Sequence, residues 1–247
     1  MAVEEAKEKE RPGSSPVCDT AAVIVAAGRF TRMEGIPKQL AIIDGKPVIA
    51  HTLSAFEKAL SVREIVLVVR PEDREAIASI CKQYHFTKVS AITDGGATRQ
   101  ESAAAGIACT SPGIAYFAIH DGARPLVASS LIDGVIQAAR RYHAASAAVR
   151  VKDTVKIADA SGFIQSTPDR RFLWNVQTPQ VFESGLYQQA LQRANEKGMD
   201  FTDDCQLVEQ LGHRVYLYEA DYKNIKITTP EDLSVAEKLL QERRAEK

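Results

Sequence analysis

The sequence predicts an α/β fold with a mostly parallel, Rossmann-like doubly wound sheet from which a β-hairpin arm protrudes. Two patterns carry this prediction. Short apolar runs alternate with longer stretches of helical character, and short connections join them. The alternation breaks between Lys152 and Trp174, where brief stretches of alternating polarity flank a turn. A chain of 247 residues suits one such domain with a small appendage.

The predicted strands are expected to be buried on both faces of the sheet. Each apolar run is short and ends near glycine, proline or polar residues, which is typical of inner strands of a parallel sheet. These strands are residues 21–27, 64–69, 88–93, 115–120 and 146–151. Ligands bind beyond the carboxyl ends of such strands, so the loops after Ala27, Thr93 and His120 are the expected site loops.

Helices are expected between these strands and near the end of the chain. Pro71 suits the first turn of a helix, which places one such start directly after a strand. The predicted helices are residues 48–60, 72–83, 99–109, 129–143 and 230–243.

The arm is predicted at about residues 152–174. Val155 and Ile157 alternate with polar residues, a turn follows, and residues 163–166 continue the pattern. A hairpin of this size cannot bury a core of its own and needs another surface to lie on. We therefore expect a homodimer that forms through the arm.

Charge and hydropathy argue against two classes of partner. Lys and Arg number 31 against 32 Asp and Glu, so the net charge is −1 and nucleic acid is not an expected partner. No apolar run approaches the ~20 residues that span a bilayer, so no membrane partner is expected either. The four cysteines lack paired spacing and are interpreted as small buried hydrophobes in a reducing compartment.

The N-terminal residues 1–19 are predicted to be a disordered tail, and residues 20–247 to be one folded domain that includes the arm. The tail mixes acidic and basic residues ahead of Pro-Gly-Ser-Ser-Pro. Secretory signals need an apolar segment and transit peptides avoid acids, so the tail fits neither. A cytoplasmic location is expected.

The loop after the first strand, AAGRFTRMEGIPKQ (residues 26–39), has the composition of an anion site. Small residues let a ligand approach the backbone, whose free N–H groups attract anions, and Arg32 and Lys38 add two cations. The loop lacks the G-x-x-x-x-G-K-[ST] and G-x-G-x-x-G patterns, which argues against a P-loop and a dinucleotide site. A nucleoside triphosphate is the ligand that this composition favours.

Six further motifs narrow the choice. In chain order they are TDGGATRQES (93–102), HDGARP (120–125), KDTVK (152–156), TPQVF (178–182), FTDD (201–204) and NIKITTPEDL (224–233). Together with Arg32-Met33 and Pro37-Lys38 they cover most of residues 21–240. The chain thus resembles the 2-C-methyl-D-erythritol 4-phosphate cytidylyltransferases, nucleotidyltransferases of the non-mevalonate isoprenoid pathway. The resemblance implies transfer of CMP from CTP to the polyol phosphate, with Mg²⁺ on the triphosphate.

The resemblance also implies a role for each matching residue. Residues implied to bind the nucleotide are Ala26, Ala27, Gly28, Gly96, Arg99, Ser102, Asp121 and Gly122. Residues implied to hold the polyol phosphate are Arg124, Thr154, Arg170, Thr178 and Lys226. Arg170 lies on the arm, so it is implied to reach the site of the neighbouring subunit.

Arg32, Lys38 and Lys226 are predicted to be catalytic. A phosphate monoester is substantially dianionic near neutral pH, so its oxygen can attack the α-phosphorus of CTP without a general base. The obstacle is repulsion between two anions, which fixed cations and a Mg²⁺ ion bridging the triphosphate offset. No protein ligand is assigned to the metal.

Local sequence leaves other interpretations open. Gly95-Gly96 could be only a turn, Arg99 and Ser102 a solvated helix face, and Asp121 a helix cap. Thr202 is read as a helix N-cap ahead of two acidic residues. Lys226, between two isoleucines, is read as a strand residue that points away from the apolar face.

The chain departs from the family pattern at Phe30, where a second loop glycine is usual, and at Ala97. The Met33–Pro37 spacing is one residue short. Two other functions therefore stay open. One is transfer to another polyol phosphate, such as ribitol 5-phosphate, and the other is nucleotide binding without catalysis.

Overall fold

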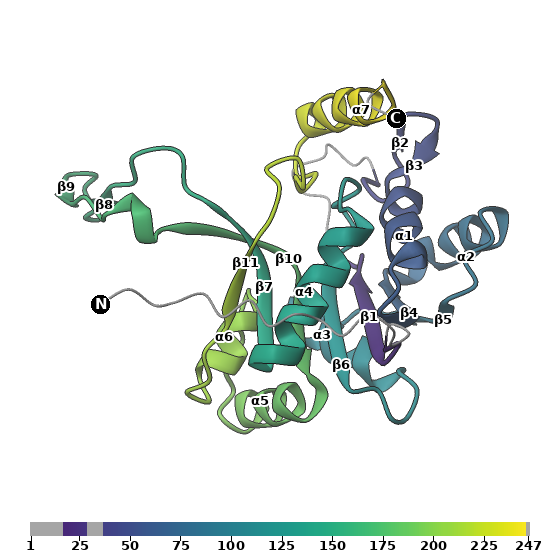
Figure 1. Cartoon of the computed structure of the whole chain (residues 1–247), viewed down its shortest axis with the longest axis horizontal. Helices are drawn as coiled ribbons and strands as arrows, with labels where there is room; N and C mark the ends of the chain where they lie inside the picture. The colour runs from purple at the N-terminus through teal and green to yellow at the C-terminus, as the bar shows by residue number, and fades with distance from the viewer. Residues whose placement is uncertain (1–16, 29–36, 246–247) are drawn as a thin grey trace, which may run out of the picture.

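A seven-stranded sheet crosses the molecule in the order β11-β7-β10-β6-β1-β4-β5 (Figure 1). This computed structural model describes residues 17–28 and 37–245. The strands are β1 (Thr20–Val25), β4 (Val62–Val69), β5 (Val89–Asp94), β6 (Tyr116–Asp121), β7 (Ala144–Arg150), β10 (Trp174–Glu183) and β11 (Tyr216–Glu219). Every pairing is parallel except the two that β10 makes with β6 and β7. The predicted, mostly parallel sheet is confirmed.

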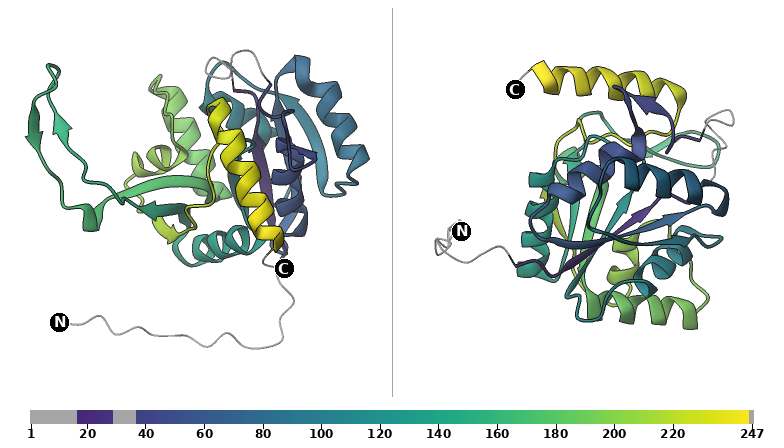
Figure 2. Two further views of the ribbon diagram at one scale, coloured as in Figure 1. Left: turned by 90° about the horizontal axis from the view of Figure 1, so that it is seen from above. Right: turned by 90° about the vertical axis from the view of Figure 1, so that its right-hand side faces the viewer.

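Helices cover both faces of the sheet (Figure 2). One face packs against α1 (Val48–Lys58), α2 (Arg74–Gln83) and α4 (Ser129–Tyr142). The other packs against α3 (Arg99–Ala108), α5 (Ser184–Glu196) and α6 (Asp204–Glu209). Along β1, Ala22 and Ile24 enter the first core while Ala21 and Val23 enter the second, and all four are fully buried. This period-two alternation between two apolar cores is what makes the sheet doubly wound.

The long strand β10 was not predicted as an element. Its first three residues are partly or fully exposed, and only Val181 and Phe182 stand out as apolar at its end. The strand forms because it inserts antiparallel between β6 and β7, which supply partners on both sides. Pairing with distant strands, not local composition, decides this element.

Three local predictions are wrong. Residues 222–229 form no strand, although Ile227 is buried and its amide donates to the Ala123 carbonyl at 2.9 Å. Thr202 is not a cap, because Asp203 is the N-cap residue of α6 and accepts a hydrogen bond from Gln180. Two cysteines, Cys18 and Cys109, are exposed rather than buried.

Smaller differences concern the ends of elements. The helix predicted at 72–83 begins as a 3₁₀ turn, Pro71–Asp73, before α2. The last helix, α7 (Pro230–Ala245), packs with the short ribbon of β2 (Ile42–Ile43) and β3 (Lys46–Pro47). Its apolar side also meets Ala123 and Leu126 from the loop after β6, so α7 supports a predicted site loop.

The arm protrudes far from the sheet, as Figures 1 and 2 show. It holds the hairpin of β8 (Ile157–Ala158) and β9 (Ile164–Ser166), followed by a 3₁₀ turn, Arg170–Phe172. Two of its aromatic side chains are largely exposed, Phe163 at 74% and Phe172 at 76%. The predicted arm is confirmed, and its apolar surface is uncovered within one chain.

Some predictions fall outside the described residues. Residues 1–16, most of the predicted tail, lie there, and so do Phe30, Arg32 and Met33. Within residues 17–28 and 37–245, no helix is long and apolar enough to cross a membrane.

Candidate active site

Two adjoining cavities lie at the carboxyl ends of the inner strands. The first, of about 260 Å³, is lined by the loop after β1, by Lys38 and Gln39, and by the turn that opens α3. The second, of about 300 Å³, is lined by β10 residues and by residues 202–203. Arg99, Asp121 and Lys226 line both cavities. A larger cavity of about 490 Å³ between α1, α4 and α7 contains none of the predicted site residues.

The glycine pair beside the first cavity, of which Gly96 lines it, is required by close packing at the start of α3. A Cβ on Gly95 would lie 2.3 Å from the Ala27 Cβ, and one on Gly96 would lie 2.3 Å from the Glu101 Cβ. The Ser102 hydroxyl closes this turn, since it accepts from the Gly96 amide at 3.1 Å and donates to the Thr98 carbonyl at 2.8 Å. Ser102 is therefore buried in the wall of the cavity and is no part of a solvated helix face.

Arg99 is held at the boundary of the cavities by a residue far away in sequence. Its guanidinium pairs with Asp204 at the start of α6, and Asp204 also accepts from the Tyr187 hydroxyl at 2.6 Å. Burial opposes the charge of Arg99, but Asp204 and Asp121 outweigh it and raise the pKa of Arg99. The ion pair with Asp204 thus holds the charged guanidinium of Arg99 in place at the boundary of the two cavities.

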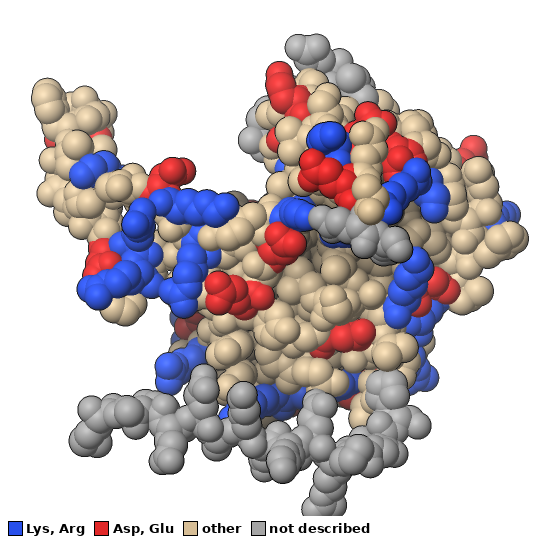
Figure 3. Space-filling model, turned by 45° about the horizontal axis from the view of Figure 1, so that its top comes forward, with Lys and Arg blue, Asp and Glu red and all other residues tan. Residues whose placement is uncertain are grey.

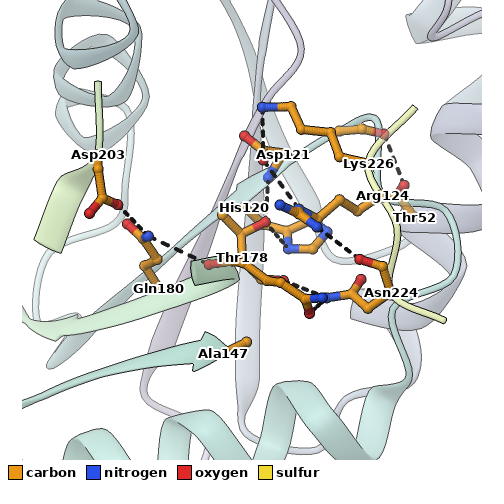
Figure 4. A network of polar contacts seen from close by, with 12 residues as sticks. Thr52, His120, Asp121, Arg124, Ala147, Thr178, Gln180, Asp203, Asn224 and Lys226 are labelled. Atoms are coloured by element: carbon orange, nitrogen blue, oxygen red, sulfur yellow. Dashed lines mark hydrogen bonds and ion pairs between the residues drawn. The ribbon is translucent and has the colours of Figure 1, made fainter. Parts of the chain in front are cut away.

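Asp121 is the centre of charge in the site (Figure 4). Its carboxylate lies 3.1 Å from the Lys226 Nζ, 3.3 Å from the Arg124 Nε and 3.8 Å from an Arg99 nitrogen. Burial opposes ionisation, but Lys226, Arg99 and Arg124 together hold the pKa of Asp121 well below its usual range. Asp121 ends β6 and caps no helix, so it is a charged site residue.

Lys226 reaches this carboxylate from a segment that is neither helix nor strand. Its side chain is 39% exposed, and an ammonium group has three protons of which Asp121 engages one. Lys226 can therefore contact an anionic ligand without leaving Asp121. Although no strand forms, the lysine does turn away from the apolar side that buries Ile227, as its position between two isoleucines predicted.

The second cavity is braced by a buried polar network from β10. Asn224 donates to the Gln177 side chain at 2.8 Å and to the Thr178 carbonyl at 3.0 Å. The backbone carbonyl of Asn224 accepts a hydrogen bond from the Arg124 guanidinium at 2.8 Å. Burial lowers the pKa of Arg124 while Asp121 favours its charged form. Thr178 and Arg124, both predicted to hold the polyol phosphate, therefore line one cavity together.

Two residues that were predicted to bind the nucleotide, Ala26 and Gly122, line neither cavity. The amide of Ala26 donates to the Val68 carbonyl at 2.7 Å, and Ala26 is only 1% exposed. The amide of Gly122 donates to Val25, and its carbonyl accepts from Thr52. A Cβ on Gly122 would lie 3.1 Å from the Gln39 amide oxygen. Among the predicted backbone contacts, Ala27, Gly28 and Gly96 are the ones that line the first cavity.

Thr154 and Arg170 are not brought to either cavity of their own chain. Both are exposed on the arm, where the Arg170 guanidinium donates to the Lys152 carbonyl at 2.9 Å. Arg32, the remaining predicted cation, lies outside the described residues.

The sequence interpretation missed three residues that hold the site together: His120, Asp204 and Asn224. Each lies within a motif named above, so the motif signal was present. Their roles were missed because each acts through a partner that is distant in sequence, as Asp204 does through Arg99 across 105 positions.

Comparisons with known proteins agree with this site. Residues 20–242 match the IspD family model, described as 2-C-methyl-D-erythritol 4-phosphate cytidylyltransferase. A protein of that description from Caldanaerobacter subterraneus subsp. tengcongensis is 48% identical over 224 residues, covering 90% of this chain and 99% of that protein. Another from Geobacillus kaustophilus is 44% identical over 226 residues, covering 91% and 98%.

A solved structure agrees in fold as well. The crystal structure of 4-diphosphocytidyl-2C-methyl-D-erythritol synthase from Anaerococcus prevotii matches with a TM-score of 0.80 at 32% identity, covering 90% of this chain and 98% of that one. The ordered motifs, the two cavities that share charged residues and the match across nearly the whole domain lead to one assignment. The chain belongs to the 2-C-methyl-D-erythritol 4-phosphate cytidylyltransferase family.

Proposed function

We propose that the protein transfers the cytidylyl group of CTP to 2-C-methyl-D-erythritol 4-phosphate, giving 4-diphosphocytidyl-2-C-methylerythritol and pyrophosphate. One observation carries the proposal beyond family membership: the two cavities share Arg99, Asp121 and Lys226. A transferase must hold donor and acceptor side by side with the reacting atoms at their boundary. The nucleotide occupies the first cavity in this proposal, and the polyol phosphate occupies the second.

The reaction needs electrostatic help more than proton transfer. The phosphate oxygen of the acceptor attacks the α-phosphorus of CTP, and pyrophosphate leaves in line. Negative charge gathers on the α-phosphoryl oxygens while two anions approach each other. Lys226 at the boundary and Lys38 in the first cavity are the described cations suited to reduce that repulsion.

Mg²⁺ is part of the proposal. Asp121 is the acidic side chain that lines both cavities, and the low pKa of Asp121 keeps it ionised. The described residues form no cluster of three or more metal-binding side chains. Mg²⁺ commonly binds through one or two carboxylates plus substrate phosphates, so one carboxylate beside a triphosphate fits it. When bound, the ion would neutralise charge on the triphosphate.

A homodimer formed through the arm is also part of the proposal. Figure 3 shows Lys and Arg side chains gathered where the arm leaves the body, and Arg150, Lys152, Arg170 and Arg171 are exposed there. Thr154 and Arg170 are too remote for their own cavities, whereas a second copy could receive them beside its polyol phosphate. The exposed Phe163 and Phe172 would be covered by the same contact. The free cysteines suit the cytoplasm, where we propose that the enzyme works.

A product assay tests the function. Purified protein is incubated with each of the four nucleoside triphosphates, Mg²⁺ and methylerythritol phosphate, and the products are separated and weighed by mass spectrometry. We expect the diphosphocytidyl product with CTP and far less product with ATP, GTP or UTP. Ribitol 5-phosphate serves as the competing acceptor. Faster turnover of ribitol 5-phosphate, or CTP binding without pyrophosphate release, would overturn the proposal.

A further inference from the structure

The cavity between α1, α4 and α7 is surrounded by basic side chains. It measures about 490 Å³, and among the described residues it shares no lining residue with the two cavities of the candidate active site. Its basic side chains come from β3, α1 and α7 and are Lys46, His51, Lys58, Arg243 and Arg244. The one carboxylate among the lining residues, Asp44, already pairs with Arg244 at 2.8 Å. Positive charge therefore exceeds negative charge around this cavity.

His51 registers this excess of positive charge. Its Nε2 lies 2.9 Å from the Ile43 carbonyl oxygen, which can only accept, so Nε2 carries a proton and Nδ1 is the nitrogen left for a ligand. Burial lowers the pKa of His51, and repulsion from Lys46 and Arg244 lowers it further. The Ile43 carbonyl and Asp44 act in the opposite direction but do not outweigh these effects. An anion beside the ring would offset the repulsion and favour a second proton, on Nδ1, which can then donate to the anion.

The loop after β6 gives the cavity an apolar wall. Pro125 and Val127 are buried there, and Leu240 of α7 lines the cavity beside them. Arg243 is held against the same loop, because its guanidinium donates to the Leu126 carbonyl at 2.7 Å. A guanidinium has five N–H groups, so Arg243 can donate to a ligand as well. Cations next to an apolar wall suit an anion that is joined to a compact apolar group.

We propose that this cavity binds a small organic phosphate, with the phosphate among Lys46, His51 and Arg244 and the apolar part against the loop after β6. Like charges gathered in one place repel one another, and a phosphate relieves that repulsion while its oxygens accept from several donors. Ala128 and Ser129, at the start of α4, also line the cavity, and helix N-terminal amides favour an anion further. The volume lies within the usual range of small-molecule sites. Such a ligand is distinct from the CTP and polyol phosphate of the proposed function, whose cavities lie elsewhere.

Calorimetry with phenyl phosphate tests the site. The whole protein is titrated with phenyl phosphate, with inorganic phosphate and with phenol, which separates the contributions of the charged and apolar parts. We expect phenyl phosphate to bind about ten times more tightly than inorganic phosphate, because the ring is buried against the apolar wall. Phenol should not bind measurably. Equal affinity for the two phosphates would overturn the inference, since the wall would then contribute nothing.

Variants locate the bound phosphate. Lys46→Ala and Arg244→Ala should each weaken phenyl phosphate binding about tenfold or more, the size expected for loss of a hydrogen bond to a charged group. Lys238→Ala is the matched control, because Lys238 lies on the same helix as Arg244 but does not line the cavity. It should change the affinity less than about threefold. Equal weakening by all three substitutions would show a general attraction of surface charge and contradict the proposal.

A further variant separates this site from the candidate active site. One binding event should persist in Lys226→Ala, since Lys226 lines the other two cavities and not this one. Binding that is lost in Lys226→Ala but kept in Lys46→Ala would place phenyl phosphate in the candidate active site only and overturn the proposal. The titrations need no turnover, so their failure is distinct from failure of the cytidylyl transfer assay.

Nitrogen-15 NMR of the histidine side chains gives a second readout. The His51 signals are identified by their loss in His51→Asn. The pKa of His51 should rise when phenyl phosphate is bound, because the anion offsets the repulsion from Lys46 and Arg244. It should also rise in Lys46→Ala without a ligand. The signals of His213, at an exposed position outside the cavity, should not respond to phenyl phosphate. An unchanged titration of His51 with phenyl phosphate bound would place the phosphate elsewhere and overturn the inference.

Discussion

At the scale of single residues, the site is organised around one buried carboxylate. Asp121 is surrounded by Lys226, Arg124 and Arg99, and the three cations more than offset its loss of hydration. The same carboxylate holds Arg99 and Lys226 at the boundary of the first and second cavities. If donor and acceptor occupy these cavities as proposed, positive charge is therefore already in place where the reaction brings two anions together.

Removal of one cation should slow the reaction without unfolding the protein. Lys226→Ala is expected to lose about 10²–10³-fold in kcat, because one charge at the transition state is missing. Its side chain is 39% exposed, and Asp121 keeps two arginines, so the fold should survive. Lys38→Ala should behave alike. Lys238→Ala, exposed on α7 and outside both cavities, is the control. Near-normal kcat in both Lys38→Ala and Lys226→Ala would contradict the mechanism.

Acid should destabilise the protein through His120. Burial lowers the pKa of His120 from 6.5 to about 3, so between these values the unfolded chain binds a proton that the folded chain refuses. Stability is then complete above pH 6.5 and falls by up to about 1.4 kcal/mol per pH unit towards pH 3. The low pKa of Asp121 has the same sign, but its contribution to stability falls only below about pH 4, where the carboxyl of the unfolded chain takes up a proton.

Urea unfolding at pH 7.5, 6 and 5 measures this slope. His120→Asn should remove the part due to the ring, whereas His213→Asn, at an exposed position, should leave the slope unchanged. An equal slope in His120→Asn and the unchanged protein would show that His120 is not the group responsible.

At the scale of elements, α3 must lie unusually close to the sheet so that Arg99 and the glycine turn meet the cavity. Gly106 makes this possible in the middle of α3. A Cβ at that position would lie 2.4 Å from the Val23 Cγ1 and 2.7 Å from the Val68 Cγ2, which are both in strands. A glycine inside a helix is unfavourable on its own account, so the close approach is its structural reason.

Gly106→Ala is expected to destabilise the protein by about 1–3 kcal/mol, because the added methyl group overpacks a closed contact. The free energy of unfolding in urea measures this. Gly185→Ala is the matched control, since Gly185 is exposed in α5 with nothing within 4 Å of an added Cβ. It should be neutral or stabilising by up to about 1 kcal/mol. A Gly106→Ala protein as stable as the unchanged one would mean that α3 moves away at no cost.

At the scale of the whole molecule, charge and apolar surface are unevenly distributed. The net charge is only −1, yet exposed cations gather at the root of the arm beside uncovered aromatic side chains. The arm is a long connection between β7 and β10 that contributes nothing to the core of its own chain. In the proposed homodimer, a second copy would give these residues a role.

Mixing two inactive variants tests this exchange. Arg170→Ala removes an arm residue, and Lys226→Ala removes a pocket residue. If the arm serves its partner, a mixed dimer has one site with both defects and one with neither. When equal amounts are mixed and the subunits reassort, about half of the dimers contain one copy of each variant, and one of the two sites in each of them is intact. The mixture should therefore show about a quarter of the activity of the unsubstituted protein. No recovery after demonstrated exchange of subunits would show that Arg170 acts within its own chain or not at all.

Local sequence determined the class of the fold and the order of most elements. The inner strands were predictable because burial on both faces of the sheet requires a short run of apolar residues. The helices were predictable because burial of one side requires apolar residues to recur every three or four positions. Several site positions were predictable as well, since Lys38, Gly96, Arg99, Asp121 and Lys226 lie in loops at the carboxyl ends of strands or in ordered motifs. The periods of strands and helices depend on neighbours in the sequence, so local sequence was enough for them. The site positions also needed the resemblance that the ordered motifs carry, because local sequence alone allowed a turn at Gly96 and a helix cap at Asp121.

Tertiary structure alone decided how these parts meet. β10 is a strand because β6 and β7 flank it, Arg99 is fixed because Asp204 arrives from α6, and Thr178 meets His120 across 58 positions. Such contacts leave no periodic mark in the chain, because a hydrogen bond or an ion pair depends on where two distant segments pack. The sequence determined which groups the protein has for its chemistry, and the packing of the sheet decided which of them share one pocket.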